Sequence, residues 1–127
     1  MPHFIIDCSE NILRHRSPEE IMGAVYDTAE STGLFAKGDI KVRIQPFQYY
    51  KLDDTKKDFL HIFGNIMEGR TIEQKANLSR KMIERLNEML PDISILSINI
   101  REFEWATYCN KSLINPLNLN NDRHFAQ

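Results

Sequence analysis

Four residues of this chain have side chains or backbone groups suited to moving a proton on an anionic substrate: Pro2, Lys41, Arg43 and Arg70. Pro2 follows Met1, so removal of Met1 would leave a secondary amine at the start of the chain. An α-amine has a pKa of about 7.7–8.0, and an apolar pocket with nearby cations lowers it. Such an amine can take up a proton and return it near neutral pH. Because proline at position 2 also commonly marks only the start of a strand, Pro2 alone is weak support.

The three cations are suited to holding carboxylates. Arg70 lies directly before Thr71, where a helix is expected to begin, and free backbone amides at a helix start favour an anion. Its guanidinium can bind a carboxylate in a bidentate way and can stabilise negative charge that develops on a bound substrate. Lys41 and Arg43 are two apart in an expected strand, so they share a face about 6.6 Å apart. The alternatives are an ordinary solvated Arg70 and an ordinary polar strand face.

The first half of the chain contains the elements that must position these residues. Residues 2–9 are rich in β-branched and aromatic residues and predict a strand that Pro2 can open. Ser17 with Glu20 forms a capping box, which predicts a helix that stops near Gly33. Residues 40–45 alternate between aliphatic and polar and predict a second strand. The expected buried stripe of the helix is Ile21, Ala24, Val25, Thr28 and Ala29.

The second half repeats this order of elements. Residues 59–67 predict a strand, Thr71 with Gln74 forms another capping box, and residues 93–103 predict a final strand. The expected stripe of the second helix, which ends before Pro91, is Ala76, Ser79, Ile83, Leu86 and Leu90. A spacing of 58 residues separates matching positions, namely His3 and His61, Lys41 and Asn99, and Arg43 and Arg101. We interpret the chain as a duplication with halves of about 1–57 and 58–127, although β-α-β units can resemble each other by chance.

The element order β-α-β-β-α-β predicts an α+β fold, an α/β sandwich in one domain over 1–127. Right-handed crossovers place the two helices on one face of a four-stranded sheet. The segment Phe4-Ile5-Ile6 is apolar on both sides, so either a partner subunit or the C-terminal tail must cover the other face, and an oligomer is expected. The Asn-rich residues 106–127 predict an irregular C-terminal arm. Trp105, just before the arm, and Tyr108 within it are expected to line a site or to contact a neighbouring subunit.

Composition excludes several classes of function. A formal net charge of -2 over 127 residues gives no electrostatic case for binding nucleic acid. No apolar run approaches the roughly 20 residues of a membrane span, and no secretory signal is recognisable, so a cytoplasmic protein without membrane partners is expected. Cys8 and Cys109 are expected to be free thiols. The four histidines lack metal-ligand spacing and are interpreted as structural, and no phosphate-binding or nucleophile motif supports hydride or phosphoryl transfer.

The segment Gly69-Arg70-Thr71-Ile72-Glu73-Gln74-Lys75 resembles a motif of the tautomerase superfamily, Gly-Arg-Ser/Thr-x-Glu-Gln-Lys. Together with Pro2 and the repeated halves, it makes the chain similar to double-length members of that superfamily. Within it, the 5-carboxymethyl-2-hydroxymuconate isomerase family is the nearest in its opening Pro2-His3-Phe4-Ile5, its helix exit Thr32-Gly33-Leu34-Phe35, its turn at Gly69-Arg70, and its late Leu117-Asn118 and Asn120-Asn121. The similarity covers nearly the full chain.

The resemblance implies a MIF-like homotrimer with three sites, no cofactor, and an amino-terminal proline as catalytic base. It also implies that a basic residue of the second strand holds the substrate, at a position where this chain has Lys41 instead of the expected Arg. The first hypothesis is therefore ketonisation of 5-carboxymethyl-2-hydroxymuconate, a small polyanionic enol from the breakdown of aromatic compounds. The alternatives are a tautomerase with another enol or haloacrylate substrate, and a non-catalytic ferredoxin-like binding module.

Overall fold

The computed structural model describes residues 1–114, and its main elements follow the predicted order. These elements are β1 (His3–Ser9), α1 (Pro18–Ser31), β2 (Lys41–Phe47), β3 (Phe59–Met67), α2 (Ile72–Met89) and β4 (Ile95–Phe103). Three shorter elements were not predicted, the 3-10 helices η1 (Glu10–Arg14) and η2 (Trp105–Thr107) and the helix α3 (Lys111–Ile114). Residues 106–114 of the predicted irregular arm therefore contain helical turns, and 115–127 lie outside the described residues.

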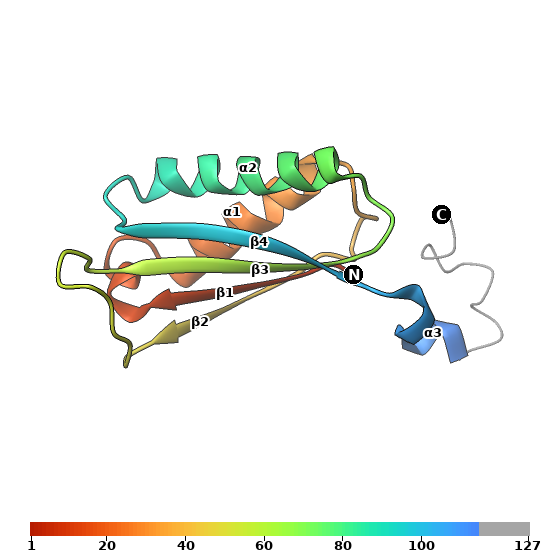
Figure 1. Cartoon of the computed structure of the whole chain (residues 1–127), viewed down its shortest axis with the longest axis horizontal. Coiled ribbons are helices and arrows are strands. Elements are labelled where there is room, and N and C mark those ends of the chain that lie inside the picture. The colour runs from red at the N-terminus through yellow and green to blue at the C-terminus, as the bar shows by residue number, and fades with distance from the viewer. Residues whose placement is uncertain (115–127) are drawn as a thin grey trace.

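The four strands form one mixed sheet in the order β2-β1-β3-β4. β1 pairs with β2 in parallel, β3 pairs with β4 in parallel, and the central pair β1 and β3 is antiparallel. Both long helices lie on the same face of this sheet (Figure 1). The predicted α+β architecture is confirmed.

Both helices begin where the capping boxes predict. Ser17 Oγ accepts a hydrogen bond from Glu20 N at 3.1 Å, and Glu20 Oε1 accepts one from Ser17 N at 3.1 Å. Thr71 and Gln74 make the same reciprocal pair, at 3.1 and 2.9 Å. These bonds satisfy backbone amides that have no partner within the helix, an effect of roughly 1 kcal/mol for each cap. The second capping box matters most here, because it determines where Arg70 stands.

The buried stripe of α2 differs from the prediction. Ala76 is exposed, and Ser79 and Ile83 are only half-buried. The residues that α2 buries are spaced four, four and three apart, which is also a helical period; they are Leu78, Met82, Leu86 and Met89. The prediction is confirmed at Leu86 and Leu90, which are buried, but it was wrong at the other three positions, because Leu78 and Ile83 both fit a helical period and only packing against the sheet decides between them. For α1 the prediction holds at Ile21, Ala24, Val25 and Ala29, while Thr28 is half-buried.

The core lies between the helices and one face of the sheet, called here the helix face. Alternate strand residues point into it, among them Phe4, Ile6, Cys8, Leu60 and Ile62, each 0% exposed. Cys8 is a free thiol, as predicted, and burial, with a smaller effect of Asp7, raises its pKa to about 11. Cys109 is also free and is exposed. Cys8 therefore behaves as a small apolar core residue rather than as a nucleophile.

The opposite side of the sheet, called here the open face, is more polar than the sequence indicated. Pairing register places Ile5 and Phe63 side by side in its centre, but most of their neighbours are polar. These neighbours are His3, Asp7, Lys41, Arg43, Gln45, His61, Asn65, Ser97, Asn99 and Arg101. The segment Phe4-Ile5-Ile6 is apolar on both sides, as predicted, but Phe4 and Ile6 point to the helix face and only Ile5 points to the open face.

A constant spacing of 58 residues does not describe the relation between the two halves. His3 pairs with Lys41 across β1 and β2, whereas His61 pairs with Ser97, not Asn99, across β3 and β4. The two parallel pairs therefore differ in register by two residues. Since side chains alternate with a period of two, the shift preserves the face on which each residue lies. The halves share their architecture, but a single offset does not superpose them.

A glycine in β3 provides a test of packing on the helix face. A Cβ atom added at Gly64 would lie 2.7 Å from Ile100 Cδ1 and 3.2 Å from Phe4 Cε1, whereas one added at Gly23 in α1 meets nothing within 4 Å. We therefore expect Gly64→Ala to lower the free energy of unfolding by ~1–3 kcal/mol. Gly23→Ala should raise it by ~0.5–1 kcal/mol, since alanine favours a helix. Urea unfolding of both variants measures this, and equal effects would contradict the packing described for Gly64.

Candidate functional site

Pro2 lies at the end of the sheet where β1 begins. Its side chain is fully buried, and its carbonyl accepts a hydrogen bond from Lys41 N at 3.1 Å, which continues the pairing of β1 and β2 by one residue. Met1 precedes it and is only 7% exposed. Both residues at the start of the chain are thus packed into the protein, so Pro2 is positioned by its surroundings and is more than the opening of a strand.

Lys41 and Arg43 share the open face of β2, as predicted. Strand register places Lys41 beside His3 and Arg43 beside Ile5. Arg43 Nη1 lies 3.2 Å from His3 Nδ1, and Lys41 Nζ donates to the carbonyl of Asp39 at 2.6 Å. Both cations are exposed. They bring positive charge to the edge of the sheet next to Pro2.

Arg70 reaches the same end of the molecule from the other face. It precedes the N-cap Thr71 in the connection between β3 and α2, and its guanidinium donates a hydrogen bond to the carbonyl of Leu34. The guanidinium carbon also lies 5.6 Å from the centroid of the Phe35 ring. The chain start and the connection from β3 to α2 lie at one end of the sheet (Figure 1). The structure therefore gathers the four predicted site residues at one end, with Arg70 on the helix side and Lys41 and Arg43 on the open face.

His3 is the titratable group whose pKa reports the electrostatics of this end. Its pKa lies below the usual 6.5, first because of burial, then because of Lys41 and Arg43, and last because of the terminal ammonium group. A neutral His3 can accept a hydrogen bond from Arg43 through Nδ1. Sequence reasoning treated His3 only as a structural residue, although its position next to Pro2 was a usable signal. Its nearness to Arg43 depends on strand register, which the sequence did not provide.

Farther along the open face, a polar network links β3 to β4. The His61 ring lies between Ser97 Oγ, 2.7 Å from Nδ1, and Asn99 Oδ1, 2.6 Å from Nε2. Arg101 Nε donates to Asn65 Oδ1 at 3.2 Å, and its guanidinium carbon lies 4.9 Å from the centroid of Phe63. These partners agree with the structural role predicted for His61, since both of its ring nitrogens are occupied.

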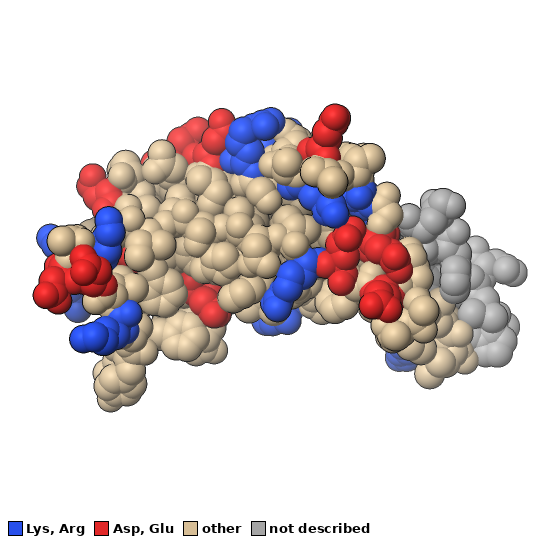
Figure 2. All heavy atoms as spheres, in the orientation of Figure 1, with Lys and Arg blue, Asp and Glu red and all other residues tan. Residues whose placement is uncertain are grey.

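Figure 2 shows how charge is distributed on one side of the molecule. Lys and Arg side chains interleave with Asp and Glu near the end that carries α3, while a broad uncharged area covers the centre. One such pair joins the helix layer to the sheet, with Lys75 Nζ 3.2 Å from Glu102 Oε2. Positive and negative charges are thus mixed at this end. The candidate site depends on a few individual cations rather than on a general excess of positive charge.

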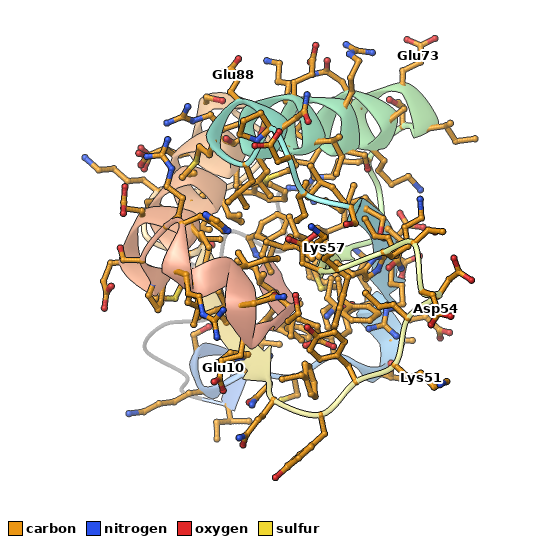
Figure 3. All side chains as sticks on the ribbon, turned by 90° about the vertical axis from the view of Figure 1, so that its left-hand side faces the viewer. Glu10, Lys51, Asp54, Lys57, Glu73 and Glu88 are labelled. Atoms are coloured by element: carbon orange, nitrogen blue, oxygen red, sulfur yellow. The ribbon has the colours of Figure 1, made fainter. Side chains whose placement is uncertain are left out.

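A cleft of about 310 Å³ lies at the opposite end of the sheet, beside η1 and the end of α2. It is lined by Ile12, His15, Arg16, Asp58, Met89, Leu90, Pro91, Asp92 and Ile93. Figure 3 views the molecule from this side, where Glu10, Lys51 and Asp54 lie around the lower part of the fold. Arg16 precedes the N-cap Ser17 just as Arg70 precedes Thr71. Arg16 donates to the carbonyl of Met89, the last residue of α2, at 3.2 Å.

The correspondence between the two ends fails at the residue before each first strand. Pro2 precedes β1, but Asp58 precedes β3, and its carboxylate accepts a hydrogen bond from Ser94 N at 2.6 Å. Arg16 also forms an ion pair with Glu20 at 3.1 Å. The cleft therefore has no group equivalent to Pro2, and its arginine already has a carboxylate partner.

Within residues 1–114, no group of three or more His, Cys, Asp and Glu side chains could hold a metal ion. No helix in this same range is long and apolar enough to cross a membrane.

The lowered pKa of His3 predicts a dependence of stability on pH. The unfolded chain, with a histidine pKa near 6.5, binds a proton at a higher pH than the folded chain does. Stability associated with His3 is therefore full above pH 6.5 and is lost as the pH falls below it. His3→Gln should lose less stability than the unchanged protein between pH 7 and pH 5 in urea titrations. Equal losses would show that folding does not lower the pKa of His3.

Comparison with known proteins agrees with this arrangement. The family model of 5-carboxymethyl-2-hydroxymuconate isomerase matches residues 2–117. The 5-carboxymethyl-2-hydroxymuconate Delta-isomerase of Escherichia coli is 28% identical over 86 residues, which cover 66% of this chain and 68% of that protein.

Solved structures share the fold. A 5-carboxymethyl-2-hydroxymuconate isomerase from Deinococcus radiodurans R1 superposes with a TM-score of 0.75 at 22% identity, over 96% of this chain and 95% of its own. A fused 4-OT protein, described as a symmetric trimer, has a TM-score of 0.72 at 11% identity, over 92% of this chain and 98% of its own. The family match, which includes Pro2 and Arg70, leads to one conclusion: this chain is an isomerase that belongs to the 5-carboxymethyl-2-hydroxymuconate isomerase family.

Proposed function

We propose that this isomerase ketonises 5-carboxymethyl-2-hydroxymuconate and moves the proton through the amine of Pro2. The observation that carries this proposal is the buried position of Pro2, at a sheet end flanked by Lys41, Arg43 and Arg70. The name of the matching family supports the choice of substrate. Such a reaction belongs to the breakdown of aromatic compounds, and we place it in the cytoplasm.

The reaction has two steps: a group removes the proton from the enol oxygen, and a proton is then delivered to a carbon of the conjugated system. An amine beside the substrate can do both in turn. The substrate is a polyanion, and charge spreads over its dienolate oxygens while the proton is in transit. Cations that meet those oxygens and carboxylates hold the substrate and stabilise this charge. We assign Arg70 and Lys41 to the carboxylates and Arg43 to support of the same charge.

The base must be neutral to accept the proton. A secondary amine is more basic than most chain termini, so its surroundings have to lower its pKa. Burial of Pro2 and the cations on β2 would both lower the pKa of this amine. The same cations lower the pKa of the neighbouring His3, which supports this reasoning.

Removal of Met1 is a condition of the mechanism. While Met1 is attached, the Pro2 nitrogen belongs to an amide and has no basic lone pair. Because Met1 is 7% exposed, its removal would also vacate packed space directly beside that nitrogen. We therefore propose that the active form begins at Pro2 and that the substrate approaches through the space that Met1 fills.

Replacement of the proline tests this mechanism. We expect Pro2→Ala to reduce the rate of ketonisation at least ~100-fold, the usual contribution of a general base. Intact mass should first show that Met1 is absent from both proteins, and circular dichroism should show that both are folded. Arg80→Ala, which removes an exposed cation from α2, serves as the control and should retain activity. If Pro2→Ala without Met1 keeps most of the activity, Pro2 is not the base. If the unchanged protein converts another enol or a haloacrylate faster, the substrate assignment is wrong.

We also propose that the protein is a homotrimer. Within residues 1–114, neither long helix lies over the open face of the sheet, and Ile5 and Phe63 lie in the centre of that face among polar side chains. The fused 4-OT protein that shares this fold is described as a symmetric trimer. A face of this kind, apolar at its centre and polar around it, has the composition of a protein interface.

A charge placed at the centre of the open face tests this assembly. The unchanged protein should sediment with about three times the 14.9 kDa of one chain. Phe63→Asp should dissociate it, since the change removes apolar surface from the centre of the proposed interface and places a charge there. Ile72→Asp, at an 81% exposed position at the start of α2, should leave the mass unchanged. A trimer that survives Phe63→Asp would exclude the open face as the interface.

A further inference from the structure

We propose that Phe35 is a positioning residue that holds Arg70 in place for the substrate. This inference rests on the proposed function, because it assigns Arg70 to a substrate carboxylate. It adds a residue that takes no part in the proton transfer itself. Phe35 lies in the connection between α1 and β2, six residues before Lys41, the first residue of β2.

The first observation is that Phe35 and Leu34 together fix the Arg70 guanidinium. The Leu34 carbonyl accepts a hydrogen bond from Arg70 Nη2, and the guanidinium carbon lies 5.6 Å from the Phe35 ring centroid. The backbone acceptor and the aromatic ring together restrict the position and the plane of the Arg70 guanidinium. Within residues 1–114, no carboxylate lies within ion-pair distance of Arg70. An arginine has five N–H donors, so donors remain for a carboxylate.

The second observation is that Phe35 is itself fixed to the strand that begins beside Pro2. Its ring meets the ring of Phe4 edge to face, with centroids 6.0 Å apart and planes at 76°. Phe4 is 0% exposed and lies two residues after Pro2 on β1. Phe35 is half-buried and packs against the core. A chain of contacts therefore runs from β1 through Phe4 and Phe35 to Arg70.

This arrangement solves a positioning problem. Arg70 comes from the connection between β3 and α2, whereas Pro2 comes from the start of the chain, 68 residues earlier. A long side chain such as arginine samples many rotamers unless its surroundings restrict them. By contacting both Phe4 and Arg70, Phe35 fixes the direction of the guanidinium relative to β1. Loss of the Phe35 ring should therefore weaken substrate binding by Arg70 but leave the proposed base in place.

The experiment compares Phe35→Leu with Tyr26→Leu. Tyr26 in α1 is also half-buried and packs against the same core, so it controls for the loss of a ring. We expect Phe35→Leu to lower kcat/KM for ketonisation about tenfold, mainly through KM, while Tyr26→Leu changes it less than about twofold. Phe35→Tyr, which keeps the ring, should retain the kcat/KM of the unchanged protein. In a protein that already carries Arg70→Ala, Phe35→Leu should lower kcat/KM almost no further, because Phe35 acts through Arg70.

A readout that needs no activity keeps the inference separate from the proposed function. In NMR spectra of the ¹⁵N-labelled protein, the Arg70 Nε–Hε signal can be identified by its absence in Arg70→Lys. The ring of Phe35 should displace its chemical shift from that of a solvent-exposed arginine. Phe35→Leu should abolish that displacement, and Tyr26→Leu should retain it. An unchanged signal in Phe35→Leu, equal losses of activity in the two leucine variants, or full additivity with Arg70→Ala would overturn the positioning role. Retained activity in Pro2→Ala with the signal displaced as expected would instead overturn only the proposed base.

Discussion

The parallel pairing of β1 with β2 is the constraint on which the rest of the site depends. It joins Pro2 to Lys41 through a backbone hydrogen bond of 3.1 Å and places Lys41 beside His3 on one face. A shift of this register by one residue would move both cations of β2 to the helix face. Burial first, and then these two cations, lower the pKa of His3 beside the chain start. The position of the proposed base and its electrostatic environment are therefore set by one strand pair.

The helix layer contributes the remaining cation, and it does so through its connections. The capping box of Thr71 and Gln74 ends the turn after β3, so that Arg70 stands directly before the N-cap. The connection after α1 supplies Leu34 and Phe35, which contact the guanidinium. None of the residues that we assign to the substrate lies in the helices themselves or in the core beneath them. They hold two connections at one end of the sheet, where loops from different parts of the chain meet.

Much of this arrangement could be predicted from local patterns. Capping boxes and strand alternation gave the order of elements, the shared face of Lys41 and Arg43, and the place of Arg70 at a helix start. The stripe of α2 could not be read reliably, because Leu78 and Ile83 both fit a helical period and only packing against the sheet decides between them. The two-residue difference in register between the halves, and the contact of Phe35 with Arg70, are long-range properties that local spacing does not contain. The roles of Pro2, Lys41, Arg43 and Arg70 remain predictions that the variants described above can decide.

We interpret the two ends of the sheet as copies of one plan that hold different residues. Arg16 precedes its helix as Arg70 does, yet Asp58 precedes β3 where Pro2 precedes β1, and a carboxylate already pairs with Arg16. A side chain can be copied when a gene segment is doubled, but a chain terminus cannot, because each polypeptide has one amino end. A protein that employs its terminus as a reagent thus gains no second reagent from doubling its length. In the proposed mechanism, the reaction therefore places no requirement on the residues of the far end.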